Sequence, residues 1–307
     1  MGGMKTPCSA DELKRLQELE EELPREIRGQ AHVLPRIMSV LRRGQLGLRK
    51  PGRPRGSFLK LGPTGTGKTE STMVFTRRLF SAEALIRLDM SEYQTQASLG
   101  VLIGSQPGEC GYLGMERQRV QEGTLLLDEI EKAHPRVLDI CLQLLDAARV
   151  TLANGQTLDF SPFYIALTSN IGAAEILGLQ YSSAATLERH VLSRAQQTLR
   201  PELFARIDEV LVFHPLNYDV QLEIAEKFLQ SELRFLKAQG YALEADDTVL
   251  AFLVRKGFHP KLGARPMRNA TERLIGDAVA KSLLLGGNGV GKLQAAEDGE
   301  SLLVRTP

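Results

Sequence analysis

The stretch Gly62-Pro63-Thr64-Gly65-Thr66-Gly67-Lys68-Thr69 decides the fold of this chain, and it fits the pattern G-x-x-x-x-G-K-[ST]. The apolar run at 56–61 directly before it predicts a short buried strand, and a helix is expected to begin near Lys68. Glycines let the backbone curl so that its N–H groups point inward at a phosphate, and the positive end of the helix adds to that attraction. Strand, loop and helix together therefore predict a phosphate-binding loop for a nucleoside triphosphate.

Two side chains at the end of this loop have expected roles in the chemistry. We expect the ammonium of Lys68 to bridge the β- and γ-phosphates, and the hydroxyl of Thr69 to bind Mg²⁺. The alternative is a glycine-rich loop that arose by chance. It would not explain why a strand precedes the loop and a helix follows it.

A second segment, Leu125-Leu126-Leu127-Asp128-Glu129, predicts a buried strand that ends in two acids. We expect Asp128 to hold the water shell of Mg²⁺ and Glu129 to polarise the attacking water as a general base. The alternative is that these acids cap a following helix, because acids favour helix N-termini. That alternative suits Glu131 better than the pair at the strand end. The chain is therefore predicted to hydrolyse a triphosphate on magnesium.

The composition bounds the number of domains and the class of partner. A chain of 307 residues, 43% of them hydrophobic, is long enough for two domains with apolar cores. The net charge of +1 argues against a nucleic-acid partner, and the basic loop at 49–55 is interpreted as a solvated connection. No apolar stretch reaches the roughly twenty residues of a membrane helix, so no membrane partner is expected. Cys8, Cys110 and Cys141 have neither metal nor disulfide spacing, which predicts a reducing, cytoplasmic location.

Strand patterns alternate with helical patterns through the first two thirds of the chain. This alternation predicts an α/β fold, a parallel sheet with helices on both faces. An amphipathic helix is expected over 11–23, ended by Pro24, and a second helical stretch over 30–48. The five expected strands are Phe58–Leu61, Ala84–Asp89, Thr124–Leu127, Phe163–Ser169 and Glu209–Phe213.

The pattern changes after residue 216 to long helical segments with no buried strand between them. Helices are expected over 218–239, 246–256 and 264–285, with a short edge strand over 301–305. We therefore divide the chain into an N-terminal extension with its helix (1–24), a large nucleotide-binding domain (25–216) and a small helical domain (217–307).

Several further motifs accompany the phosphate loop in a fixed order. They are Ile27-Arg28-Gly29-Gln30, Glu70, Leu88-Asp89-Met90-Ser91-Glu92-Tyr93, the run LLLDEIEKAHP at 125–135, Thr168-Ser169-Asn170, the segment 200–209 and Gly263-Ala264-Arg265-Pro266. With this set the chain resembles the AAA+ ATPases, and most closely the second ATPase module of the ClpB-type disaggregases and unfoldases. The resemblance implies a P-loop AAA+ large domain, with a five-stranded parallel sheet between helices, and a smaller, mainly helical C-terminal domain. It also implies ATP hydrolysis by a ring, usually a hexamer, that remodels a protein substrate with or without an adaptor.

The resemblance also implies roles for residues that spacing alone does not assign. Asn170 corresponds to the polar residue that orients the attacking water, although on its own it reads as a turn-former. Arg206 corresponds to the arginine finger that reaches the γ-phosphate of a neighbouring subunit; its alternative is an ion pair with Asp208 or Glu202. The positions implied to bind ATP are Ile27 and Arg28 at the adenine, Thr64, Gly65, Thr66, Gly67, Lys68, Thr69 and Glu70 at the phosphates, and Arg265 as the sensor of the small domain.

One segment departs from the family pattern. The family threads protein through its ring with a Gly-aromatic-aliphatic-Gly loop, but here the aromatic position holds Glu109 and the aliphatic one Cys110. A large ring that could grip a peptide is therefore missing. Residues 115–119 also stand where the family has a helix and a turn, so an altered pore is expected.

Three functions are therefore compared. The first is an ATP-driven protein remodeller with an atypical pore loop. The second is a partner-activated switch or scaffold similar to the torsins, which also lack the pore aromatic but have no arginine finger of their own. The third is a nucleic-acid loader or helicase, which only the basic segment 42–55 supports.

Overall fold

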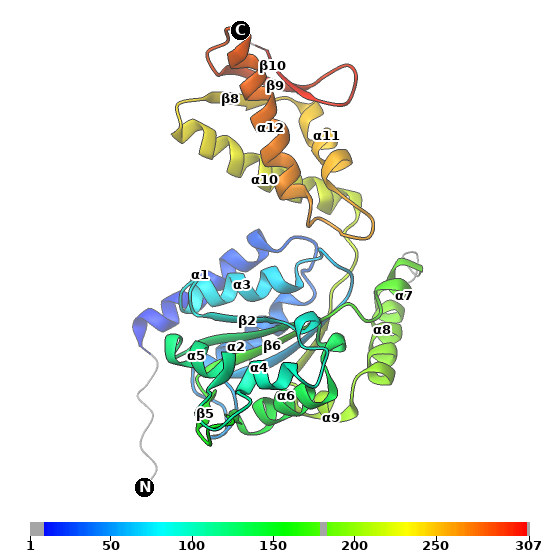
Figure 1. Cartoon of the computed structure of the whole chain (residues 1–307). Helices are drawn as coiled ribbons and strands as arrows, with labels where there is room; N and C mark the ends of the chain where they lie inside the picture. The colour runs from blue at the N-terminus through cyan, green and yellow to red at the C-terminus, as the bar shows by residue number, and fades with distance from the viewer. Residues whose placement is uncertain (1–8, 179–182, 306–307) are drawn as a thin grey trace. The chain divides into compact units, whose positions relative to one another are not determined.

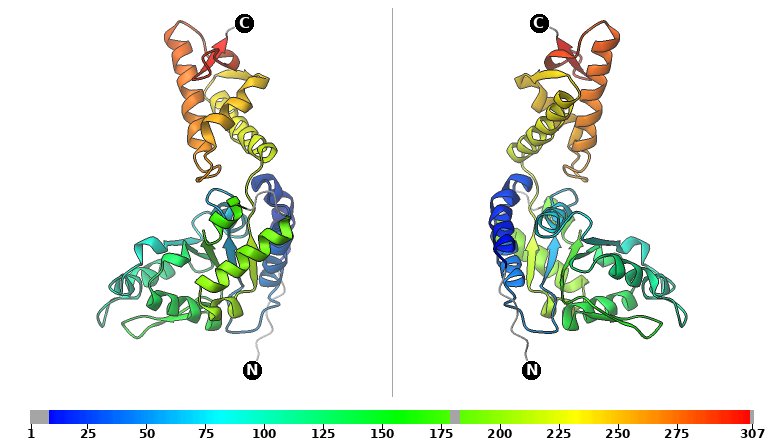
Figure 2. Two further views of the ribbon diagram at one scale, coloured as in Figure 1. Left: turned by 90° about the vertical axis from the view of Figure 1, so that its right-hand side faces the viewer. Right: turned by 90° about the vertical axis from the view of Figure 1, so that its left-hand side faces the viewer.

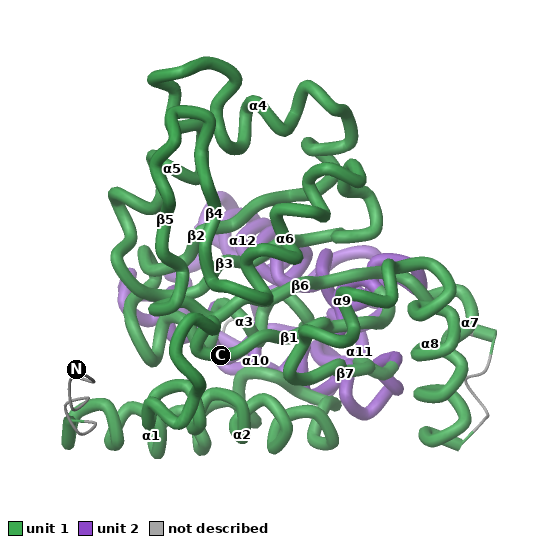
Figure 3. Tube along the Cα trace, turned by 90° about the horizontal axis from the view of Figure 1, so that it is seen from below, with its two compact units in different colours: residues 1–63, 67–214 green, residues 64–66, 215–307 purple. Residues whose placement is uncertain are grey.

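A computed structural model of the chain describes residues 9–178 and 183–305; Cys8 lies outside this range. The chain forms two compact units, which Figure 3 colours separately. The first unit comprises residues 1–63 and 67–214, and the second comprises 64–66 and 215–307. Within the described residues, no helix is long and apolar enough to cross a membrane.

The first unit is built on a five-stranded parallel sheet with the order β2-β3-β6-β1-β7. All five strands predicted from the sequence are confirmed. Because the strands are parallel, their carboxyl ends lie along one edge of the sheet, as the pairing of Leu61 with Ser169 shows. The phosphate loop, the acid pair and Asn170 all follow strand ends at this edge. The strands are β1 (Gly56–Leu61), β2 (Leu85–Asp89), β3 (Gly123–Asp128), β6 (Phe163–Ser169) and β7 (Glu209–Val212).

Helices cover both faces of this sheet, as Figures 1 and 2 show. The first face holds α1 (Ala10–Glu26), α2 (Leu34–Gln45) and α3 (Lys68–Leu79) around a core that includes the buried rings of Phe58 and Tyr164. The second face packs a larger apolar core against the odd-numbered residues of β1. The other α-helices described in this unit are α4 (Ser98–Ile103), α5 (Gly111–Arg119), α6 (Pro135–Ala147), α7 (Ala173–Gly178), α8 (Ala184–Thr198) and α9 (Pro201–Arg206).

A short antiparallel hairpin in this unit was not predicted. Strands β4 (Arg149–Thr151) and β5 (Thr157–Asp159) pair across a turn in which Gly155 has a φ of 82°. The dipeptide Asn154-Gly155 is a turn signal, but the strands on either side have only three residues each. They are too short to show a convincing alternation of apolar and polar residues.

Helix α1 corrects the expectation that Pro24 ends the first helix. The helix begins with a capping box, in which Ser9 and Glu12 bond each other's backbone N–H groups, and it continues past Pro24 to Glu26. Proline removes one backbone donor in the last turns. The burial of Leu23 and Ile27 in the core holds those turns in place regardless.

The second unit contains three helices and a small sheet. Helices α10 (Tyr218–Ala238), α11 (Asp247–Gly257) and α12 (Met267–Leu284) agree with the predicted ones within a few residues. The predicted edge strand is β10 (Leu302–Arg305), which pairs with β9 (Val290–Ala295). Strand β8 (Ala242–Ala245) lies on the other side of β9. Neither β8 nor β9 was predicted, because most of their residues are exposed or partly exposed and give no apolar run.

We predict that α1 is a stabilising part of the first unit. Leu19 is fully buried among residues of α1, α2 and α3, so Leu19→Ala should lower the free energy of unfolding by about 3 kcal/mol through lost burial and a cavity. Leu13 on the same helix is 43% exposed, and Leu13→Ala should change it by no more than about 0.5 kcal/mol. Urea unfolding measures both, and equal midpoints for the two variants would contradict the packing of α1.

Candidate nucleotide site

The phosphate loop has the backbone geometry that its glycines predict. Gly62, Gly65 and Gly67 have φ values of 133°, 72° and 102°, which side chains rarely adopt. Space is also limited: a Cβ on Gly62 would lie 2.4 Å from the carbonyl oxygen of Phe213, and one on Gly67 would lie 3.3 Å from Ile27 Cγ2. Helix α3 begins at Lys68 with no side-chain cap on its N–H groups. Those N–H groups are therefore available to an anion.

Lys68 is buried, and its ammonium is held by oxygens of its own loop. Lys68 Nζ donates to the carbonyl oxygens of Gly62 and Pro63, both at 2.7 Å, and to Asn170 Oδ1 at 3.1 Å. Burial lowers the pKa of Lys68 from 10.5 to about 8, while the nearby carboxylates of Glu131, Asp128 and Glu129 oppose that shift. A triphosphate would supply the compensating negative charge that the loop carbonyls only partly provide.

Asp128 is the most densely bonded acid of the site. Its Oδ1 accepts from the hydroxyls of Thr69 at 3.0 Å and Thr168 at 2.9 Å. Its Oδ2 accepts from Arg87, with Nε at 2.7 Å and Nη2 at 2.6 Å. Thr168, on the neighbouring strand β6, belongs to the motif Thr168-Ser169-Asn170, but it was assigned no role because threonine is an ordinary strand residue.

The donor set at Asp128 fits Mg²⁺. A carboxylate and the Thr69 hydroxyl are hard oxygen ligands in contact with each other. The described residues contain no group of three or more His, Cys, Asp or Glu side chains that could hold a metal ion. Mg²⁺ needs few protein ligands, because it completes its shell with phosphate oxygens and water. When bound, the ion would neutralise charge on the phosphates.

Glu129 has a strained backbone and a fixed side chain. Its φ of 58° is left-handed, which is uncommon for a residue other than glycine and is often found at functional sites. Its N–H donates to Thr168 Oγ1 at 3.2 Å, and its Oε1 accepts from Asn170 Nδ2 at 3.3 Å. The other carboxylate oxygen pairs with Lys132, which raises the pKa of that lysine.

Asn170 joins the two sides of the site. Its side-chain oxygen accepts from Lys68 and its side-chain nitrogen donates to Glu129. Its backbone N–H donates to Glu131 Oε1 at 3.0 Å. The side chain thus links the phosphate-binding lysine to the acid expected to act as base. From sequence alone Asn170 was interpreted as a turn-former and Glu131 as a helix cap. The contacts of Asn170 with Lys68, Glu129 and Glu131 join residues far apart in the chain, so no local pattern predicts them.

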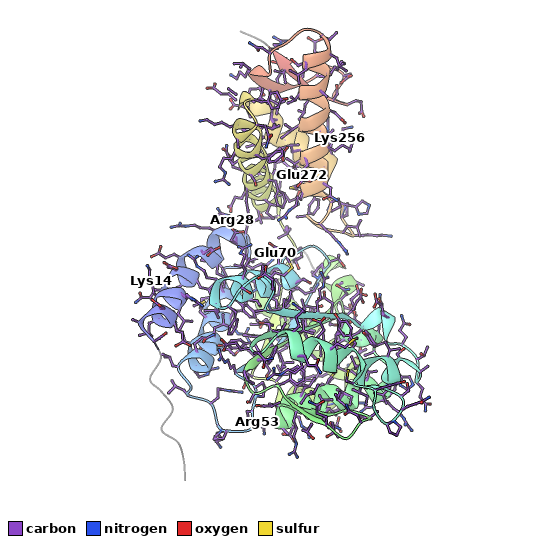
Figure 4. All side chains as sticks on the ribbon, turned by 60° about the vertical axis from the view of Figure 1, so that its left-hand side comes forward. Lys14, Arg28, Arg53, Glu70, Lys256 and Glu272 are labelled. Carbon is purple, nitrogen blue, oxygen red and sulfur yellow. The ribbon has the colours of Figure 1, made fainter. Side chains whose placement is uncertain are left out.

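The residues expected at the adenine lie beside the loop. Ile27 follows the last residue of α1, is 3% exposed, and contacts the position where a Gly67 side chain would project. Figure 4 shows Arg28 just beyond α1 and Glu70 in the first turn of α3. Thr64, Gly65 and Thr66 form the middle of the loop and group with the second unit.

The polar contacts of Arg206 do not involve the residues of the phosphate site. It is the last residue of α9, where its Nη1 donates to the backbone oxygen of Glu202 at 3.0 Å and its Nε lies 3.7 Å from Asp146 Oδ2. The alternative pairing with the Glu202 or Asp208 carboxylate is wrong, because Asp208 pairs with Arg49 at 2.6 Å. The side chain is 30% exposed, so its guanidinium remains accessible.

Three further residues were predicted to act in the site or the pore: Arg265, Glu109 and Cys110. Arg265, in the second unit, directly precedes Pro266, the N-cap of α12. Glu109 is exposed in the loop between α4 and α5, and its Oε2 accepts from the N–H of Ser105 at 2.8 Å. Cys110 is a partly buried free thiol at the N-cap of α5.

Residues 115–119, where an altered pore is expected, are helical. These residues belong to α5, which is helical throughout Gly111–Arg119. Its first turn packs tightly, since a Cβ on Gly111 would lie 2.4 Å from the backbone nitrogen of Gly104. The buried Leu113 then anchors the helix to the core.

Comparisons with known proteins identify the family. Residues 53–210 match the AAA domain (Cdc48 subfamily), and residues 216–292 match the C-terminal, D2-small domain of ClpB protein. The chain belongs to the Clp family of AAA+ ATPases. The chaperone protein ClpB of Vibrio vulnificus strain YJ016 is 38% identical over 285 residues, covering 90% of this chain and 33% of that protein.

Two solved structures are also similar to this AAA+ chain. The Hsp104–ADP complex of S. cerevisiae has a TM-score of 0.86 and 28% identity, covering 97% of this chain and 53% of that one. A closed-state reconstruction of Hsp104 with ATPγS and FITC casein has a TM-score of 0.84 and 28% identity, covering 97% of this chain and 52% of that one. The chain therefore spans about half of each Hsp104 chain and a third of the ClpB protein.

We predict that Asn170 acts on hydrolysis and not on nucleotide affinity. Asn170→Ala removes the link between Lys68 and Glu129, so kcat for ATP should fall by about 10²-fold through loss of positioning, with the Kd for ATPγS nearly unchanged. Asn154 in the β4–β5 turn is the matched control, because its side chain bonds only to the nearby N–H of Gln156. Steady-state turnover and titration of ATPγS measure the two effects, and an equal loss of turnover in both variants would contradict the role.

Proposed function

We propose that this chain is an ATP-hydrolysing ring protein that remodels or unfolds a protein partner. The observation that supports it best is the contact chain from Lys68 through Asn170 to Glu129, which ties phosphate binding to the proposed base. Asp128, bonded to Thr69, supplies the carboxylate for Mg²⁺ beside it. Each group that triphosphate hydrolysis needs from one subunit is thus present in one cluster.

The proposed reaction divides among these residues. The N–H groups at the start of α3 and the ammonium of Lys68 bind the phosphates, and Asn170 holds the attacking water near Glu129. Glu129 takes a proton from that water as it attacks the γ-phosphorus, and ADP leaves with the bridging oxygen. Arg206 of an adjacent subunit would stabilise the charge of the transition state. Arg265 would sense the nucleotide from the second unit.

The proposed partners are further copies of this chain, usually six in the family, and a protein substrate or adaptor. Arg206 makes its polar contacts with Glu202 and Asp146 and not with Lys68, Glu129 or Asn170, and this supports its action on the phosphate of a second subunit in a ring. The similarity to an Hsp104 reconstructed with casein supports a protein substrate. The free thiols of Cys110 and Cys141 are in keeping with a reducing, cytoplasmic location.

The pore loop suggests a weaker grip on the substrate than an aromatic ring would give. Glu109 is charged and exposed, and its carboxylate is turned back onto the backbone of Ser105. It offers no apolar surface to a peptide. A torsin-like switch activated by a partner is the second candidate function, and this loop is the observation that favours it.

We predict that Glu129 and Arg206 act on the same reaction from different subunits. Glu129→Gln and Arg206→Ala should each reduce ATP turnover by about 10²-fold or more, because one removes the base and the other the cation at the transition state. A mixture of the two inactive proteins should recover part of the activity, since the first variant supplies an intact Arg206 to the second. Turnover of mixed rings at varied ratios measures this recovery.

The matched control for Arg206 is Asp146→Ala. It removes the carboxylate 3.7 Å from Arg206 Nε without touching the arginine, and it should leave turnover nearly unchanged. If Asp146→Ala is as inactive as Arg206→Ala, the arginine acts through its own chain. If mixtures of the two inactive variants show no recovery, the finger does not act between subunits.

We predict that Glu109→Tyr leaves ATP turnover unchanged and increases unfolding of a tagged substrate. The side chain contacts only its own loop, and tyrosine adds the apolar ring that the loop lacks. Turnover and substrate fluorescence, measured on the same preparation, test both halves. Robust processive unfolding by the unaltered protein would contradict the weak grip. If the pure protein is inert and a partner restores hydrolysis, the torsin-like function is favoured instead.

Images of the ATP-bound Glu129→Gln protein test the proposed assembly. This variant should bind ATP without consuming it, so rings, their subunit number and the pore can be seen together. Closed rings with Arg206 at the neighbouring phosphate support the proposal. Monomers at saturating ATP would overturn it.

A further inference from the structure

Strand β1 carries a fully buried lysine directly beneath the phosphate loop. Lys60 is 0% exposed, and its Nζ lies within hydrogen-bonding distance of Thr72 Oγ1 at 2.7 Å, Ser71 Oγ at 2.8 Å and Lys68 O at 3.3 Å. All three acceptors are neutral oxygens. Among the described residues, no carboxylate lies within ion-pair distance of Lys60, although buried lysines are seldom found without one.

The surroundings of Lys60 disfavour a permanent charge. The rings of Phe58 and Phe75 lie 5.6 and 5.2 Å from its Nζ. On the neighbouring strands its register partners are Thr168 and Leu211, both neutral. Burial lowers the pKa of Lys60 from 10.5 to about 7, and the negative charge of Asp128 opposes this shift only in part.

The groups closest to Lys60 that bear on its charge belong to two elements. Asp128 at the end of β3 favours its protonated form. Lys68 at the start of α3 contributes its backbone oxygen as a hydrogen-bond acceptor. The three acceptors all lie in the first two turns of α3, at the end of the helix where phosphate is proposed to bind. A triphosphate there would add several negative charges close to Lys60 and favour its protonated form.

We propose that Lys60 is a positioning residue of the nucleotide site, which takes up a proton when a triphosphate binds and then fixes the first turn of α3 with a charged ammonium. The proposal rests on the proposed nucleotide site. Its proton comes from the solvent and joins the free amine of Lys60. The ammonium then has three donors for the three oxygens that surround it.

A merely structural lysine would behave differently. Ser71 Oγ already donates to Lys68 O at 2.8 Å, so this hydroxyl keeps a partner without Lys60. Thr72 can bond the same carbonyl, four residues before it, as threonine does in helices. Lys60→Met should therefore remove a poorly solvated amine without leaving an unpaired group, and should raise the melting temperature of the nucleotide-free protein.

The test is calorimetric titration of Mg²⁺ and ATPγS into the whole chain and its Lys60→Met variant, in buffers of different ionisation enthalpy. The unaltered protein should take up as much as about one proton more than the variant per nucleotide at pH 7.5, because burial disfavours the charged amine before binding. Protonation of the nucleotide and of Lys68 is common to both proteins and cancels. The affinity of the unaltered protein for ATPγS, divided by that of the Lys60→Met variant, should fall from pH 7 to pH 9 by up to about tenfold per pH unit.

Lys14→Met is the matched control, because the Lys14 side chain is 73% exposed on α1. It should titrate like the unaltered protein. If Lys60→Met does not fold, Lys60→Gln tests the same proton count with a polar side chain.

Equal proton uptake by the unaltered protein and the Lys60 variant would overturn the proposal, as would a lower melting temperature with unchanged affinity. In either case tight binding of ATPγS would leave the proposed function standing. If the unaltered protein does not bind ATPγS, the proposed function fails first.

Discussion

The interaction on which the rest of the site depends is the binding of the buried Lys68 ammonium by its own loop. A lysine this well buried needs oxygens on several sides, and the carbonyls of Gly62 and Pro63 supply two of them. Those carbonyls can turn inward only because the loop passes through left-handed backbone conformations at its glycines. The N–H groups at the start of α3, which follows the loop, have no side-chain cap and are available to an anion. One backbone curl thus positions both the cation and the donors of a phosphate site.

The parallel sheet brings the acids to that curl. β3 and β6 are neighbours, so Asp128 and Glu129 at the end of one strand lie beside Thr168 and Asn170 at the end of the other. Thr168 bonds both acids, to the carboxylate of Asp128 and the N–H of Glu129. The strained backbone of Glu129 is tolerated because these contacts over-determine it. Hydrogen bonds and charge interactions therefore connect the phosphate loop, the two acids and Asn170 in one network. A small displacement of any member would disturb the contacts of the others.

The sequence predicted those elements that a pattern of consecutive residues identifies. Five buried strands, the phosphate loop and the acid pair all have such local patterns, and the structure contains the strands and loop as expected. The partners of those residues were not predictable in the same way. Thr168 and Glu131 contact the site only because the sheet order is β3-β6-β1, which no local pattern states. Lys60 was interpreted as part of an apolar run, although a lysine inside a buried strand was itself a signal.

The central claim is that the triphosphate takes over Lys68 from its own loop while Asn170 keeps its link to Glu129. A structure of this chain with Mg²⁺ and ATPγS bound tests this most directly. The account predicts that Lys68 Nζ moves from the carbonyls of Gly62 and Pro63 to oxygens of the β- and γ-phosphates, with Asn170 still bonded to Glu129. A bound nucleotide with Lys68 still on those two carbonyls and no phosphate contact would contradict it.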